Sequence, residues 1–272
     1  MTQSLFDIEL TLLLEAVHLR YHYDFRGYAR ALLERRVGEL MHSLDLRSLS
    51  ALQERLLREP DVFHLLMSSF TIQVSEMFRD PPFFRTLREK VTTVLQTYPS
   101  LKLWVAGCST GEELYSIAIV LREEGLLGRT LIYATDINQE AIRAAETGVY
   151  ALERMAQFSE AYLAAGGRAS LADYFTVAYG AARFDPSLRK DVVFADHSLA
   201  TDSVFAEVQL VSCRNVLIYF DRELQDRTIG LFRDSLCRKG FLCLGSKETL
   251  RFSKLASEFS EFDRQQRVYQ RR

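Results

Sequence analysis

The stretch LKLWVAGCSTGEELYSIAI, residues 101–119, decides the fold of this 272-residue chain. An apolar run rich in β-forming residues ends at Gly107, and Gly111 directly precedes residues whose apolar spacing is helical. The pattern predicts a strand, a tight glycine loop and a helix. Such a loop lets the backbone approach a ligand at the carboxyl end of a strand, where open α/β sheets bind nucleotides. The loop is therefore the first candidate site.

The charges beside this loop narrow the choice of nucleotide. The predicted helix starts with Glu112 and Glu113, and two carboxylates at a helix N-terminus repel the pyrophosphate of a dinucleotide. The loop itself, GCSTG, matches neither the dinucleotide fingerprint nor the phosphate-binding loop with its lysine. A ligand with an ammonium group and no phosphate fits better, and S-adenosylmethionine is such a ligand.

A second predicted strand, residues 131–136, supports this choice. It ends in Asp136, and an acid at the end of the second strand is the arrangement that holds ribose hydroxyls. The alternative is that Glu112, Glu113 and Asp136 only start or cap helices, which is common for acids at these positions.

Four segments in order give the chain a specific resemblance. VAGCSTGEELYSIAI at 105–119, YATDIN at 133–138 and SCRNVLIYFD at 212–221 are similar to motifs of the CheR family of chemotaxis-receptor methyltransferases. SEMFRD at 75–80 is similar to the segment before that family's catalytic domain. The resemblance implies an α/β, Rossmann-like S-adenosylmethionine-dependent methyltransferase domain with a small antiparallel β-subdomain, preceded by an all-α N-terminal domain. It also implies methyl esterification of glutamate side chains on a chemoreceptor.

Composition limits the other classes of protein. The net charge is −2 and no tract is dense in lysine and arginine, so nothing indicates a nucleic-acid or membrane surface. The chain has no apolar run of about eighteen residues and no basic leader, so we expect a cytoplasmic protein without membrane insertion. Its four cysteines form no C-x-x-C pair, so we expect neither a metal site nor a disulfide framework.

Hydrophobic periodicity divides the chain into two domains. Residues 1–70 predict a helical domain, because apolar positions recur at helical spacing and only Pro60 interrupts them. Residues 71–86 predict a packed linker in which Pro81-Pro82 stops any helix. Residues 87–272 form the methyltransferase domain, and residues 159–195 depart from its alternation of strands and helices. Short strands expected at 174–180, 182–188 and 192–194 make that stretch an antiparallel insertion.

The resemblance implies that three residues of the linker contact the cofactor: Gln73, Ser75 and Arg79. Arg79 can bind the cofactor carboxylate with two parallel hydrogen bonds, although an ion pair with Asp80 or another acid is the structural alternative. The family usually has Asn in place of Gln73 and Thr in place of Ser75, and the longer glutamine puts its contact in doubt. The other implied cofactor positions are Gly107, Glu113, Asp136, Ser198, Leu199, Cys213, Arg214 and Asn215.

Ser198 departs from the family pattern, which usually has an Asn-Leu pair near the adenine. A direct amide contact to the base is therefore lost, and a water or His197 is left to substitute. A general-base role for His197 is disfavoured, because a lone histidine is usually structural and a glutamate carboxylate, with a pKa near about 4.3, is already a nucleophile at neutral pH. Catalysis then rests on orientation and desolvation.

Arg214 and Tyr219 are the predicted catalytic residues, since the resemblance places them near the transferred methyl group. Arg214 is expected to orient the substrate carboxylate and Tyr219 to shape its approach, and a core aromatic is the alternative for Tyr219. An end-of-strand Asn with a nearby aromatic also suits an amine or nucleic-acid methyltransferase, but the chain lacks N-P-P-Y and a basic surface. A catalytically silent receptor-docking module is the remaining alternative.

The expected partner is the cytoplasmic helical domain of a chemoreceptor, met by a monomer that binds no nucleic acid. A predicted helix at 24–41 carries Arg26, Arg30, Arg35 and Arg36, which form either a receptor-docking face or a merely solvated one. Some CheR-family enzymes add a receptor C-terminal peptide as an extra strand to the β-subdomain. Here Gly180 is close to the next strand and Pro186 follows it, so we expect an enzyme that needs no such tether.

Overall fold

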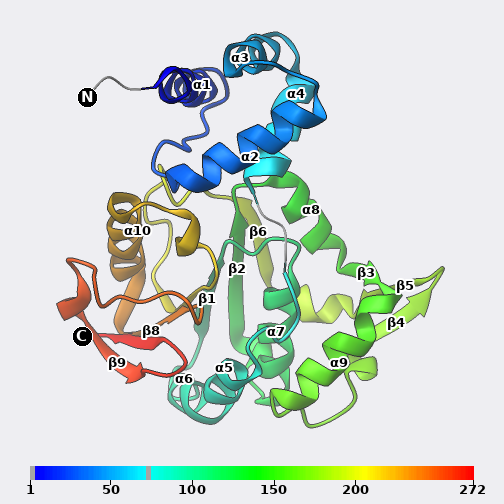
Figure 1. The fold of residues 1–272 in the computed structure, drawn as a ribbon. Helices are drawn as coiled ribbons and strands as arrows, with labels where there is room; N and C mark the ends of the chain where they lie inside the picture. The colour runs from blue at the N-terminus through cyan, green and yellow to red at the C-terminus, as the bar shows by residue number, and fades with distance from the viewer. Residues whose placement is uncertain (1–3, 72–74) are drawn as a thin grey trace.

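The computed structural model describes residues 4–71 and 75–272. The helical domain consists of α1 (Leu5–Tyr21), α2 (Arg30–Ser43), α3 (Leu49–Arg58) and α4 (Pro60–Phe70), which gather at one end of a large sheet (Figure 1). Most apolar positions predicted from helical spacing, such as Leu10, Leu33 and Leu52 at no more than 1% exposed, form one core, whereas Leu57 is exposed. The all-α N-terminal domain is confirmed.

The large sheet has seven strands in the order β6-β2-β1-β7-β8-β10-β9. Neighbours from β6 to β8 pair in parallel, whereas β10 is antiparallel to both β8 and β9. This mostly parallel arrangement confirms the expected Rossmann-like fold. The strands are β1 (Leu101–Ala106), β2 (Thr130–Asp136), β6 (Val192–Asp196), β7 (Val208–Cys213), β8 (Leu236–Leu244), β9 (Phe259–Asp263) and β10 (Val268–Arg271).

Helices connect these strands, as parallel pairing requires. The main connections are α7 (Glu112–Glu123), α8 (Gln139–Thr147) and α10 (Arg222–Ser235), while α9 (Met155–Ala164) belongs to the insertion. Before β1 lie α5 (Pro81–Thr86), a π-helical turn (Leu87–Val91) and α6 (Thr92–Leu95). Trp104 of β1 is fully buried on one face of the sheet, where it packs against Phe232 of α10. The opposite face packs against α7.

The small sheet is antiparallel and consists of β3 (Val149–Ala151), β5 (Ala181–Phe184) and β4 (Phe175–Ala178), in that order. A turn at Tyr179 and Gly180, both with positive φ, joins β4 to β5. The small antiparallel β-subdomain is confirmed, but its third strand is β3, which precedes the predicted stretch 159–195, and the assignment of 192–194 to it was wrong, because β6 pairs in parallel with β2. A short apolar run specifies a strand without specifying its partner. Pro186 also lies outside the strands, in the turn after β5.

Two helix boundaries differ from the predictions. Pro81-Pro82 starts α5 rather than only stopping a helix, because proline suits a first turn whose N–H groups have no helical partner. The helix predicted from residue 24 begins at Arg30, because residues 27–29 form a backbone bridge to the turn before α10. Ala29 N–H donates to the Tyr219 carbonyl at 2.8 Å, and Asp221 N–H donates to the Gly27 carbonyl at 2.8 Å. Within 4–71 and 75–272, no helix is long and apolar enough to cross a membrane.

Candidate active site

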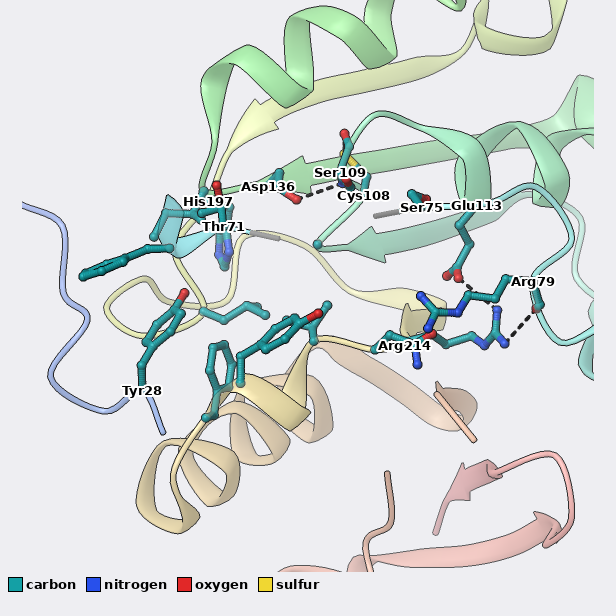
Figure 2. Close-up of a pocket in the computed structure, with 18 of the residues that line it drawn as sticks. Tyr28, Thr71, Ser75, Arg79, Cys108, Ser109, Glu113, Asp136, His197 and Arg214 are labelled. Carbon is teal, nitrogen blue, oxygen red and sulfur yellow. Dashed lines mark hydrogen bonds and ion pairs between the residues drawn. The ribbon is translucent and has the colours of Figure 1, made fainter. Parts of the chain in front are cut away.

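A cavity of about 980 Å³, including its open mouth, lies where the carboxyl ends of β1, β2 and β7 meet the helical domain (Figure 2). Predicted site residues that line it are Ser75, Arg79, Gly107, Glu113, Asp136, Leu199, Arg214, Asn215 and Tyr219. Residues from separate parts of the sequence therefore meet at the carboxyl ends of the strands, where the glycine loop predicted a site.

The cofactor loop, residues 107–111, is held against the end of β2. Gly107 has a φ of +72°, and a Cβ there would lie 2.5 Å from a methyl carbon of Val216, so only glycine fits. The N–H groups of Gly107 and Cys108 donate to the Thr135 carbonyl at 2.8 and 2.9 Å. These contacts fix the start of the loop at the end of β2, and Gly107, Cys108 and Ser109 line the cavity.

Asp136 faces one end of the cavity and organises the backbone around it. Its carboxylate accepts from the N–H groups of Ser109 at 2.8 Å and Asn138 at 2.9 Å. Burial raises the pKa of Asp136, and these N–H groups oppose that rise by stabilising the charged form. The second strand thus ends in a partly buried carboxylate, as the sequence predicted.

Glu113 lies at the other end of the cavity, in the first turn of α7 (Figure 2). Its carboxylate accepts from the Ser212 hydroxyl at 2.7 Å and pairs with the Arg214 guanidinium at 3.0 Å. Arg214 also pairs with Asp80 at 2.8 Å. The cavity therefore carries fixed negative charge at the start of α7.

Arg214 is buried, and its side chain is only 1% exposed. Besides its two carboxylate partners, the guanidinium donates to the Arg79 carbonyl at 3.0 Å and lies 4.0 Å from the centre of the Phe83 ring. A buried cation between two carboxylates is held by them, because breaking such a pair leaves an uncompensated charge. This geometry favours a positioning role for Arg214 over the predicted contact with a substrate carboxylate.

Comparison with known proteins decides the family. The model "CheR methyltransferase, all-alpha domain" matches residues 8–71, and "CheR methyltransferase, SAM binding domain" matches residues 73–267. The chain belongs to the CheR methyltransferase family. It is a methyltransferase whose cofactor is S-adenosylmethionine, and the resemblance inferred from its motifs is confirmed.

Three relatives illustrate the similarity. A Pseudomonas putida protein named as methyltransferase Cher3 is 55% identical over 97% of either chain. Chemotaxis protein methyltransferase 2 of Pseudomonas aeruginosa is 32% identical over 78% of this chain and 76% of that protein. A chemotaxis protein methyltransferase of Listeria innocua is 32% identical over 68% of each chain.

The residues of this CheR-family chain fit the cofactor. The acid Asp136 and the acid Glu113 lie at opposite ends of the cavity (Figure 2), as ribose hydroxyls and an ammonium group require. The Ser109 hydroxyl and His197 Nδ1 are buried beside it without a hydrogen-bond partner in the part of the chain that the structure describes. Unpartnered buried polar atoms of this kind are uncommon in a folded protein. Among the described residues, Arg79 forms no ion pair with Asp80 or another acid, and Asp80 pairs with Arg214 instead.

Of the predicted cofactor residues that the structure describes, Cys213 and Ser198 do not line the cavity. Gln73 lies outside the described residues. Cys213 points into the core on one face of β7 and is fully buried. Ser198 donates its N–H to Asp202 at 2.9 Å, and its hydroxyl is buried away from the cavity. Contacts from these three residues remain predictions from the family resemblance.

The helical domain contributes cavity residues that the sequence did not reveal. Tyr28, Phe70 and Thr71 line the cavity, and Tyr28 reaches toward it opposite Asp136 (Figure 2). Burial, followed by the charge of Asp136, raises the pKa of Tyr28, so this hydroxyl stays protonated at neutral pH. No motif marks these positions; Tyr28 reaches the cavity through the backbone bridge at residues 27–29, and Phe70 and Thr71 lie at the end of α4. His197 also lines the cavity.

Proposed function

We propose that this chain methylates glutamate side chains on the cytoplasmic helical domain of a chemoreceptor, forming methyl esters. The observation that carries the proposal is the meeting of Glu113, Asp136, Arg214 and Tyr219 in one cavity of a CheR-family fold. Relatives named chemotaxis protein methyltransferase support the receptor as substrate. The protein acts in the cytoplasm, as a monomer, and binds no nucleic acid.

Different residues of the cavity bind different groups of the cofactor. S-adenosylmethionine supplies an electrophilic methyl group on a sulfonium. Glu113 binds the ammonium group and Arg79 the carboxylate at one end of the cavity, while Asp136 binds the ribose at the other. Arg214 fixes Glu113 and the backbone of Arg79 and thereby sets where the methionine part lies.

Tyr219 meets the incoming carboxylate. It ends a 3₁₀ turn (Leu217–Tyr219) and lines the cavity, half-buried. Burial raises the pKa of Tyr219, so its hydroxyl remains a hydrogen-bond donor at neutral pH. A glutamate carboxylate is ionised at that pH and needs no general base. Removing it from water beside Tyr219, in line with the methyl group, is then the main contribution of the enzyme.

The helical domain offers arginines to an acidic receptor helix. In the free chain they already pair with the protein's own acids, as Arg30 does with Asp7 and Arg36 with Glu39. Arg26 likewise pairs with Glu15 at 2.9 Å. Exposed pairs of this kind stabilise a fold only weakly, so receptor carboxylates can replace the internal partners at small cost.

Transfer of a tritiated methyl group to a purified receptor cytoplasmic domain tests the proposal. Base-labile counts on the receptor mean a methyl ester and support it. Base-stable counts mean amine methylation, and an absence of counts means a docking module, so either result contradicts it. The variant Tyr219→Phe, which keeps the ring and loses the hydroxyl, should slow single-turnover transfer by about tenfold while leaving cofactor binding intact.

A further inference from the structure

Glu248 is a buried carboxylate outside the cavity. It follows β8 in the stretch GSKETL at 245–250, and only 4% of the residue is exposed. One oxygen accepts from the N–H groups of Gly245 at 2.6 Å and Asn215 at 3.0 Å, and the other accepts from Ile218 N–H at 3.3 Å. Backbone donors from two separate segments therefore converge on this one side chain.

The segment that Glu248 holds, residues 215–218, connects Arg214 with Tyr219. Asn215 has a φ of +63°, in the left-handed region that residues with a side chain adopt infrequently, asparagine more readily than most. The segment contributes Asn215 and Val216 to the cavity wall and sets the directions of its two neighbours. A conformation of this kind persists only where its surroundings impose it.

Gly245 has no room for a side chain, because Asn215 and Glu248 lie against it. Cys213 of β7 pairs with Leu244 of β8, so Gly245 lies next to the start of the segment. A Cβ on Gly245 would lie 2.8 Å from Asn215 N and 2.9 Å from a carboxylate oxygen of Glu248. The glycine thus admits the carboxylate between the ends of two neighbouring strands at the edge of the cavity.

We propose that Glu248 is a positioning residue for methyl transfer, which fixes residues 215–218 by accepting their N–H groups and so places Arg214 and Tyr219. It touches neither cofactor nor substrate, since it lies on the far side of the segment from the cavity. The inference rests on the proposed function for its kinetic consequence. Its structural consequence, the order of the segment, can be measured without any transfer.

The variant Glu248→Gln tests this role because it keeps the shape of the side chain but exchanges an acceptor oxygen for an N–H₂ group. That group meets at least one backbone N–H, so donor faces donor. We expect single-turnover transfer at saturating cofactor to fall by about tenfold or more, and the affinity for S-adenosylhomocysteine to fall by a smaller factor. Amide exchange at Asn215 and Ile218 should become faster.

Leu95→Ala is the matched control for loss of stability alone. Leu95 is fully buried on α6, which precedes β1 and lies at the amino end of the sheet, away from the cavity. It should lower the unfolding temperature without changing the single-turnover rate below that temperature. A Glu248→Gln rate within about twofold of native, or a loss no larger than the control's at matched stability, would overturn the inference.

The exchange measurement separates this inference from the proposed function. If the native chain places no ester on a receptor, the proposed function fails, and exchange at Asn215 and Ile218 still decides whether Glu248 orders the segment. Native-like exchange in Glu248→Gln would overturn the inference in either case.

Discussion

Replacing Asp136 by alanine tests whether its carboxylate binds the cofactor. The carboxylate holds Ser109 N–H and Asn138 N–H at 2.8 and 2.9 Å and faces the cavity, so its remaining lone pairs are free for ribose hydroxyls. Hydrogen bonds to a charged group contribute about 1.5–3 kcal/mol each before the cost of ordering. We expect Asp136→Ala to weaken S-adenosylmethionine binding by about 1–3 kcal/mol, or about 5- to 150-fold in Kd.

Isothermal calorimetry of the folded variant measures this loss directly. The matched control is Asp196→Ala, because Asp196 is the register partner of Asp136 on β6 but is exposed and does not line the cavity. The control should bind the cofactor almost as the native chain does. Asp136→Asn, which keeps one oxygen for Ser109 N–H, should fall between the two. An unchanged Kd in a folded Asp136→Ala protein would remove Asp136 from the site.

Three further predictions follow from other parts of the structure. His197→Gln should retain most of its single-turnover rate at saturating cofactor, and a loss by orders of magnitude with cofactor bound would reveal a missed base. Burial alone would raise the pKa of Glu123, but hydrogen bonds from Tyr162 and Tyr174 and the charge of Arg88 lower it. The stabilising effect of ionised Glu123 is therefore present above about pH 4.3 and is lost as pH falls through the lowered pKa. In Glu123→Gln, the free energy of unfolding measured with urea should therefore decrease less steeply as the pH falls below about 4.3. An unchanged decrease would refute this prediction. A receptor C-terminal peptide should not bind residues 174–194 at micromolar concentration, and transfer should fall as salt rises above roughly 0.15 M; micromolar binding mapped there would contradict it.

Local patterns predicted most of the fold and the centre of the site. The glycine loop and the strand ending in Asp136 depend on residues close together in sequence, so their geometry follows from φ, periodicity and strand direction. Gly107 illustrates this, since its positive φ and the close approach of Val216 both require glycine.

Features that depend on distant partners were missed or misplaced. The strand at 192–194 was assigned to the wrong sheet because its pairing with β2 is set by the whole sheet. Tyr28 lines the cavity only because residues 27–29 form a bridge to residues 219–221. The ion pairs of Arg214 with Asp80 and Glu113 join three separate motifs, and no spacing within one motif indicates them.

We infer that this cavity delivers a methyl group to a glutamate carboxylate of a receptor helix. Peptide mass spectrometry of a receptor cytoplasmic domain, after incubation with the native enzyme and S-adenosylmethionine, tests it most directly. We expect one added methyl group on glutamate side chains, removed by mild base and reduced with the Asp136→Ala enzyme at a cofactor concentration below its raised Kd. Methyl groups on lysine or arginine nitrogen, or an unmodified receptor in the presence of bound cofactor, would contradict it.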